Sequence, residues 1–159
     1  MDENVEGALK LVPYGMYVIG SGSGDEVNGM TANWVTQCSF SPRRVAVAIK
    51  QAAHTRGLID RGGHFTVNVV ADGDLDLLKL FVKPQRRTGA KFGDDVGFRE
   101  ASAGAPILDA AIAWVECRVV AGHDDGGDHV LFVGEVIDGG VQHEGAPFLI
   151  RDTGWNYAG

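Results

Sequence analysis

Residues 28–49, NGMTANWVTQCSFSPRRVAVAI, determine how the rest of this chain is organised. The stretch begins with small and polar residues, turns at Ser41-Pro42, and ends in an apolar run over residues 45–49. Short side chains along residues 30–33 allow a flat polar ligand to lie against the main chain. The apolar run is typical of a strand that is buried on both faces. The stretch predicts a polar binding surface that leads into a core strand. The alternative is two ordinary strands with a turn at residues 28–29.

The bulk composition limits the class of protein. The chain has 159 residues, of which 45% are hydrophobic and 22% charged, so we expect one globular domain over residues 1–159. The formal net charge of -7 argues against nucleic acid and anionic membranes as main partners. No apolar run reaches membrane-spanning length. Two cysteines, Cys38 and Cys117, are too few for a disulfide framework, and we expect reduced thiols in a cytoplasmic protein.

Alternating apolar residues predict strands, which we place over residues 14–21, 27–38, 44–49, 64–70, 112–121 and 129–137. The Gly-rich segments at residues 20–24 and 124–127 are typical of hairpin turns between them. Because the strands do not alternate with long helices, the pattern predicts a mainly β fold, an antiparallel barrel with short peripheral helices.

Two or three short helices are expected: one over residues 54–61, one over 75–81, and a third over 4–10, where the alternative is a frayed end. Asp74 is the predicted N-cap of the helix over residues 75–81. Residues 83–105 are irregular and are interpreted as a long loop. Glu116 and Arg118 lie two positions apart in a predicted strand, so we expect them to share a solvated face and to pair.

The histidines and cysteines show no metal-site pattern. None of the five histidines has the i, i+4 helical pairing of a zinc site, and no Cys-x-x-Cys pair is present, so we expect no metal. The sequence also lacks the Gly-x-Ser-x-Gly elbow of acyl transfer. Residues 20–24 lack the Lys-Ser/Thr of a phosphate loop.

Residues 50–55, KQAAHT, follow a buried strand directly and precede a predicted helix. Amides at a helix N-terminus, the hydroxyl of Thr55 and the cation of Lys50 suit a phosphate group. The alternative is an ordinary capped helix beside a solvated lysine. Together with the short side chains at residues 30–33, the segment predicts a mononucleotide cofactor such as a flavin.

Several motifs in the same order resemble the flavin reductase-like FMN-binding proteins. They are NGMTAN at residues 28–33, SFSP at 39–42, GHFTVN at 63–68, the pair Lys91 and Phe92, and GDHVLFVGEV at 127–136. The segments YGMYV at residues 14–18 and RDTGW at 151–155 further resemble the flavoredoxin-like branch found beside rubredoxin and flavodiiron modules. The resemblance covers nearly the whole chain.

The resemblance implies a split β-barrel that binds FMN, with FAD as the alternative flavin, in a homodimer. It implies reduction of the flavin by NAD(P)H and transfer of electrons to a separate acceptor, such as a redox protein or a monooxygenase. At least one of Trp34, Trp114 and Trp155 is expected at the dimer interface, since buried aromatic residues anchor interfaces. Two alternatives stay open. One is an FMN-binding electron-transfer module without its own NAD(P)H site, and the other is a related split barrel that binds haem or a deazaflavin.

The resemblance also implies the residues of the site. The flavin ring and ribityl chain would be bordered by Met30, Thr31, Ala32 and Asn33. The ring edge would be approached by Gln37, Cys38 and Ser39, and the phosphate would be held by Lys50, His54 and Thr55. Two loop residues, Lys91 and Phe92, would close over the cofactor. The catalytic candidate is His129, at the flavin face where nicotinamide must stack.

Overall fold

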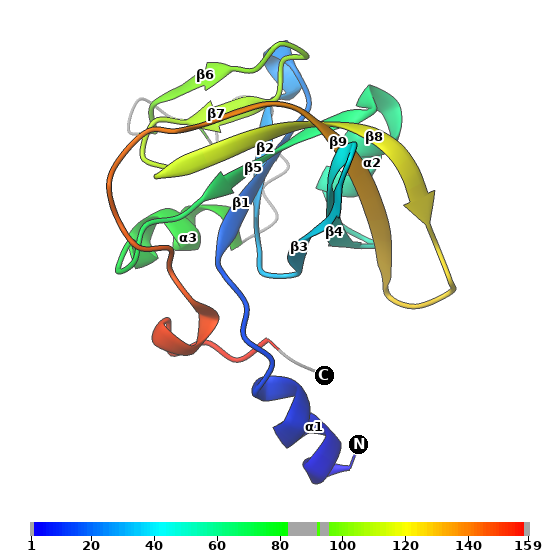
Figure 1. Ribbon diagram of the computed structural model, residues 1–159, viewed down its shortest axis with the longest axis vertical. Helices are drawn as coiled ribbons and strands as arrows, with labels where there is room; N and C mark the ends of the chain where they lie inside the picture. Colours follow the sequence, from blue (N-terminus) through cyan, green and yellow to red (C-terminus); the bar gives the residue numbers. More distant parts are fainter. Residues whose placement is uncertain (1, 83–91, 93–95, 158–159) are drawn as a thin grey trace.

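Seven strands form one antiparallel sheet, and a two-stranded hairpin accompanies it (Figure 1). The computed structural model of the chain describes residues 2–82, 92 and 96–157. The strands of the large sheet are β1 (Tyr17–Ser21), β2 (Asn28–Ala32), β3 (Val35–Phe40), β4 (Arg43–Lys50), β5 (His64–Val69), β8 (Ala113–His123) and β9 (His129–Val141). Their spatial order is β2-β1-β5-β8-β9-β4-β3, and neighbouring strands are antiparallel throughout.

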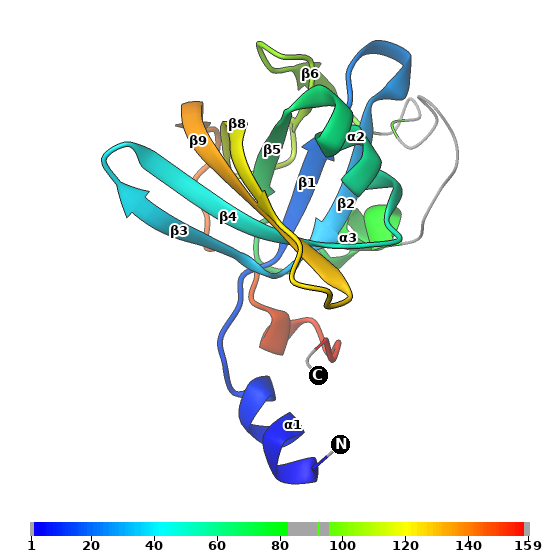
Figure 2. The same cartoon turned by 90° about the vertical axis from the view of Figure 1, so that its right-hand side faces the viewer.

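The two edge strands of this sheet are consecutive in the sequence. Only Asn33 and Trp34 separate β2 from β3, and the Ala48 N–H donates to the Trp34 carbonyl over 3.0 Å. Because an extended chain spans only about 3.5 Å per residue, the two edges must approach each other, and the sheet curls into an open barrel (Figure 2). The predicted antiparallel barrel is confirmed. The prediction of a single strand over residues 27–38 is wrong. The chain forms two strands there, β2 and β3, which lie at opposite edges of the sheet.

Short helices accompany the sheet in the described residues. They are α1 (Glu3–Lys10), α2 (His54–Gly62) and α3 (Leu75–Val82), with 3-10 turns η1 (Gly24–Glu26) and η3 (Ile150–Asp152). The predicted cap of α3 is confirmed, because Asp74 Oδ1 accepts from the Leu77 N–H over 3.1 Å. Figures 1 and 2 show α1 extending away from the sheet, and none of its residues is buried. Across residues 2–82, 92 and 96–157, no helix combines the length and the apolar character needed to cross a bilayer.

Two clusters of buried side chains make up the core. One joins strands of the barrel to α2 and contains Ile19, Val47, Ile49, Ile59, Phe65, Val67, Cys117, Val130 and Phe132. The other joins the opposite face of β1 to α3 and contains Met16, Val18, Val27, Val70, Leu77, Leu78, Phe81, Phe92, Leu108, Ala111 and Phe148. Successive residues of a strand point to opposite faces, so Val18 and Ile19 belong to different clusters.

A small hairpin is formed by β6 (Phe98–Glu100), within the segment predicted as a loop, and β7 (Pro106–Leu108), directly after that segment. Its turn is bound to Glu116, whose carboxylate accepts from the Ser102 N–H over 3.2 Å, the Ser102 hydroxyl over 2.9 Å and the Ala103 N–H over 2.8 Å. Glu116 is only 1% exposed. The predicted surface pair with Arg118 is therefore wrong, and Arg118 Nη2 instead lies 3.5 Å from Glu135 Oε1.

Candidate functional site

A cavity of about 890 Å³ opens where β2, the end of β4, the start of α2 and the start of β9 meet. The residue pair 33–34, the end of α3 and residues 154–157 complete its walls. Its volume lies within the range of about 300–1,000 Å³ that is usual for small-molecule sites. These elements meet because the curled sheet brings the β2 edge close to β4 and β9, which are far from β2 in the strand order.

Most of the predicted site residues line this cavity. They are Met30, Thr31, Ala32, Asn33, Lys50, His54, Thr55 and His129, which come from β2, the link after it, β4, α2 and β9. Lys50 and His129 are opposite each other in the β4–β9 ladder, so the last residue of one strand meets the first of the other. The structure thus brings the predicted ring-binding, phosphate-binding and catalytic residues around one space. Their roles stay predictions.

The predicted ring-edge residues lie elsewhere. Gln37 and Cys38 are exposed on β3 and Ser39 is half-buried, and none of the three lines the cavity. The reason is the change of edge after Asn33, which directs β3 along the outer side of β4. In the single continuous strand that was predicted, Gln37, Cys38 and Ser39 would have stayed on the same strand as residues 30–33.

The two predicted loop residues are also not placed at the cavity. Phe92 packs in the core, with its ring centroid 5.5 Å from Phe81 and 4.5 Å from Phe98. It does not line the cavity. Lys91 lies outside the described residues. The cavity wall on this side is instead made by Phe81 and Val82 of α3.

The Lys50 corner of the cavity can bind an anion. Helix α2 begins after Ala53, whose side chain makes no capping hydrogen bond. The first N–H groups of a helix lack i−4 partners. The Arg56 N–H donates to the Ala53 carbonyl over 3.1 Å, so the N–H groups before it, of His54 and Thr55, are the ones that could bind a ligand. Lys50 is exposed beside them, and Thr55, only 2% exposed, accepts from Asn28 Nδ2 over 3.1 Å. The Thr55 hydroxyl proton remains able to donate, because a hydroxyl both donates and accepts.

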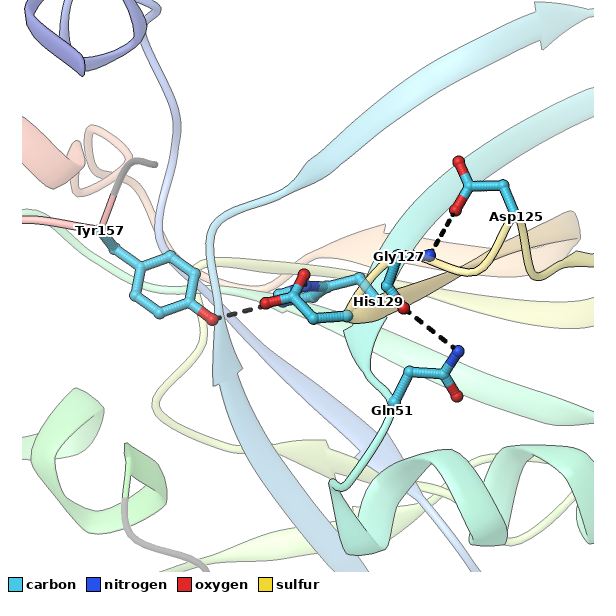
Figure 3. A network of polar contacts seen from close by, with 6 residues as sticks. Gln51, Asp125, Gly127, His129 and Tyr157 are labelled. Atoms are coloured by element: carbon cyan, nitrogen blue, oxygen red, sulfur yellow. Dashed lines mark hydrogen bonds and ion pairs between the residues drawn. The ribbon is translucent and has the colours of Figure 1, made fainter. Parts of the chain in front are cut away.

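The His129 corner contains a chain of polar contacts. His129 Nδ1 lies 2.6 Å from Asp128 Oδ1. On the other side of the ring, Nε2 lies 3.3 Å from the Tyr157 hydroxyl (Figure 3). The Trp34 ring packs against the imidazole, with centroids 4.7 Å apart. The hydrogen bond from His129 lowers the pKa of the Asp128 carboxyl, so this group stays ionised. Burial, followed by the charge of Asp128, raises the pKa of Tyr157, so the phenol keeps its proton.

Two residues of this corner, Trp34 and Tyr157, were not predicted as site residues. Their ring centroids are 5.3 Å apart, and the Tyr157 carbonyl accepts from Asn33 Nδ2 over 3.5 Å. The large apolar residues Trp155 and Tyr157 indicate that this segment packs on the fold. They do not indicate the surface on which it packs, so the contact with His129 was found only in the structure.

Comparison with known proteins gives a family and several relatives. The family described as "Flavin reductase like domain" matches residues 9–156. A putative diflavin flavoprotein A 6 of Nostoc sp. is 33% identical over 142 residues, which cover 89% of this chain and 25% of that protein. The chain therefore spans about a quarter of the length of the first curated relatives. The NADH-dependent FMN reductase AsuE2 of Streptomyces nodosus subsp. asukaensis is 33% identical over 129 residues, covering 81% of this chain and 69% of that protein.

Solved structures agree with these matches. The flavin reductase PheA2 has a TM-score of 0.78 at 30% identity and covers 94% of this chain and 93% of its own. BorF, the flavin reductase component of a bacterial two-component tryptophan halogenase, has a TM-score of 0.83 at 26% identity and covers 99% and 98%. The barrel, the cavity and these matches together show that the chain belongs to the flavin reductase-like family.

Proposed function

We propose that this chain is an FMN-dependent oxidoreductase that takes a hydride from NADH or NADPH and passes electrons to a separate acceptor. The observation that carries the proposal is one cavity that joins an anion-binding corner at Lys50 and α2 to the imidazole of His129. A phosphate-bearing ring compound that is held by Lys50 would share the cavity with His129, which is opposite Lys50 in the β4–β9 ladder. Such a site serves a redox cofactor whose ring meets a second substrate.

The residues of the cavity suit FMN. Lys50 and the first amides of α2 would hold its phosphate through charge-assisted hydrogen bonds. The short side chains of Thr31 and Ala32 would allow the ring to lie against β2. When bound, the flavin supplies a ring that accepts and releases two electrons. FAD is the alternative flavin, and titration of the protein with each flavin compares the two affinities.

Two relatives support the proposed reaction. The name of AsuE2 states NADH-dependent reduction of FMN, and that protein shares most of its length with this chain. BorF is described as the flavin reductase component of a two-component halogenase, which also has a second component. The proposed acceptor of this chain is therefore a separate redox protein or oxygenase.

The second candidate function is electron transfer from bound FMN without a nicotinamide site. It is favoured by the diflavin flavoproteins, in which the matched segment makes up about a quarter of the protein. In that arrangement the domain would exchange electrons with neighbouring segments. The two candidates differ in one property, which is whether a nicotinamide reduces the bound flavin directly.

The test is anaerobic addition of NADH or NADPH to the FMN-loaded protein, with the flavin absorbance followed by stopped flow. We expect bleaching of the flavin band within seconds. Mixing the same amounts of free FMN and nicotinamide without protein is the control. Tight FMN binding without bleaching by either nicotinamide would favour the electron-transfer module, and absence of flavin binding would contradict both candidates.

His129→Ala is expected to slow this reduction about tenfold to a hundredfold, the effect of one or two hydrogen bonds at about 1.4 kcal/mol per tenfold. FMN affinity should change little, because the proposed phosphate donors, Lys50 and the first amides of α2, are left in place. The measurement is the reduction rate paired with an FMN titration. His143→Ala, which removes a histidine that contacts Asp109 outside the cavity, is the matched control. Equal rates in the His129 variant and the wild type would exclude a catalytic role.

We also propose that the protein is a homodimer. The apolar residues Val5 and Leu9 of α1 are exposed, and Phe40, at the end of β3, is 88% exposed. A second subunit would cover such surface. Trp34 and Trp155 line the cavity, so a subunit placed at its mouth would contact them. Light scattering at micromolar concentrations should give twice the chain mass, and a monomeric mass throughout would contradict the proposal.

A further inference from the structure

The contacts on the two nitrogens of His129 differ in strength. Nδ1 lies 2.6 Å from Asp128 Oδ1, whereas Nε2 lies 3.3 Å from the Tyr157 hydroxyl. The first distance is that of a short, charge-assisted hydrogen bond. The second is longer than the about 2.8 Å that is typical of hydroxyl hydrogen bonds. The contact with Asp128 therefore has the larger influence on which ring nitrogen of His129 carries the proton.

The chemistry of the partners assigns the protons. An ionised carboxylate only accepts hydrogen bonds, so Nδ1 of His129 must carry a proton and donate a hydrogen bond to Asp128. In the neutral ring the Nε2 atom then has a lone pair, and the Tyr157 hydroxyl must be the donor to it. Tyr157 supplies that donor because its phenol is protonated.

The position of Nε2 matters because His129 lines the cavity and Tyr157 lines the wall beside it. The lone pair of Nε2 accepts a hydrogen bond from one donor at a time, either Tyr157 or a ligand in the cavity. Tyr157 is half exposed, and its hydroxyl lies 3.3 Å from Nε2, so a donor that makes a shorter hydrogen bond can replace it. The Trp34 ring, 4.7 Å from the imidazole, keeps the orientation of His129 when that happens.

We propose that Asp128 is a positioning residue that holds His129 with its proton on Nδ1, and that the Tyr157 hydroxyl occupies the Nε2 lone pair until a donor group of the second substrate replaces it. This inference rests on the proposed function for the identity of that substrate. The matching donor is an amide N–H, such as the carboxamide group of a nicotinamide. Asp128 thus selects a ligand that donates a hydrogen bond at this point and disfavours one that only accepts.

The protonation state can be tested without any ligand. Long-range proton–nitrogen NMR correlations report which ring nitrogen carries the proton, at a pH where histidines are neutral, about 8.5. We expect the proton of His129 on Nδ1 in the wild type and in Tyr157→Phe, and a shift toward Nε2 in Asp128→Ala. The matched control is Asp125→Ala, which removes a carboxylate from the same turn that binds the Gly127 N–H and does not touch His129 (Figure 3). A wild-type proton on Nε2, or an unchanged state in Asp128→Ala, would overturn the assignment.

Steady-state kinetics with NADH and the FMN-loaded protein test the replacement of Tyr157. Asp128→Ala should raise the KM for NADH about two- to tenfold, the effect of one hydrogen bond. Tyr157→Phe should lower this KM by about the same factor, because a competitor for Nε2 is removed. A raised KM in Tyr157→Phe would overturn the place-holding role. If NADH does not reduce the wild-type protein, the proposed function fails, whereas the NMR result still decides the role of Asp128.

Discussion

Glu116→Ala is expected to lower the free energy of unfolding by about 2–4 kcal/mol, because hydrogen bonds to a charged group are worth about 1.5–3 kcal/mol each. The carboxylate is buried under the β6–β7 turn and accepts from both Ser102 and Ala103. The expected loss is less than the sum of these bonds, since both turn residues are exposed and water replaces part of the contact. The variant should keep its fold and lose the fixed position of the hairpin.

Urea unfolding measures this effect as a shift of the midpoint at constant slope. Glu135→Ala is the matched control, because it removes a glutamate on the neighbouring strand β9 that pairs with Arg118 at the surface. Surface pairs are worth about 0–1 kcal/mol, so this control should change stability little. If the two variants lose the same stability, Glu116 is not the anchor of the hairpin.

Lys50→Glu is expected to weaken FMN binding by about 2–4 kcal/mol, because it removes a charge-assisted donor and places a carboxylate beside the phosphate. This loss corresponds to an about 30- to 700-fold higher Kd. Lys50 is the better choice than Thr55, whose hydroxyl also accepts from the buried Asn28 amide. Truncation of Thr55 would leave that amide unpaired and change the fold together with the site.

Fluorescence titration with FMN measures the Kd of this variant. Lys79→Glu is the matched control, because it makes the same charge change on an exposed residue of α3 that does not line the cavity. Both variants should unfold at about the wild-type urea midpoint. An FMN affinity that falls equally in both variants would mean that only overall charge matters, and an unchanged affinity in Lys50→Glu would place the phosphate elsewhere.

Local sequence patterns determined the elements and part of the site. The aromatic and β-branched residues of β1, the alternation in β5, the Asp74 cap of α3 and the position of α2 soon after β4 each depend on residues close together in the chain. Such patterns carry short-range information on backbone conformation and burial. They were therefore sufficient to predict that residues 30–33 and 50–55 form one site, and the cavity confirms that these segments meet.

Only the tertiary structure decided which distant side chains meet. Glu116 was expected at the surface, yet the β6–β7 turn covers it, because burial depends on a hairpin with no clear local pattern. Gln37 and Cys38 lie outside the cavity because the chain passes at residues 33–34 from one edge strand of the sheet, β2, to the other, β3. Tyr157 reaches His129 because the curled sheet and the segment after η3 bring them together. Strand order and sheet curvature determine these contacts. Both arise from pairing between strands that are far apart in the sequence, which local patterns do not describe.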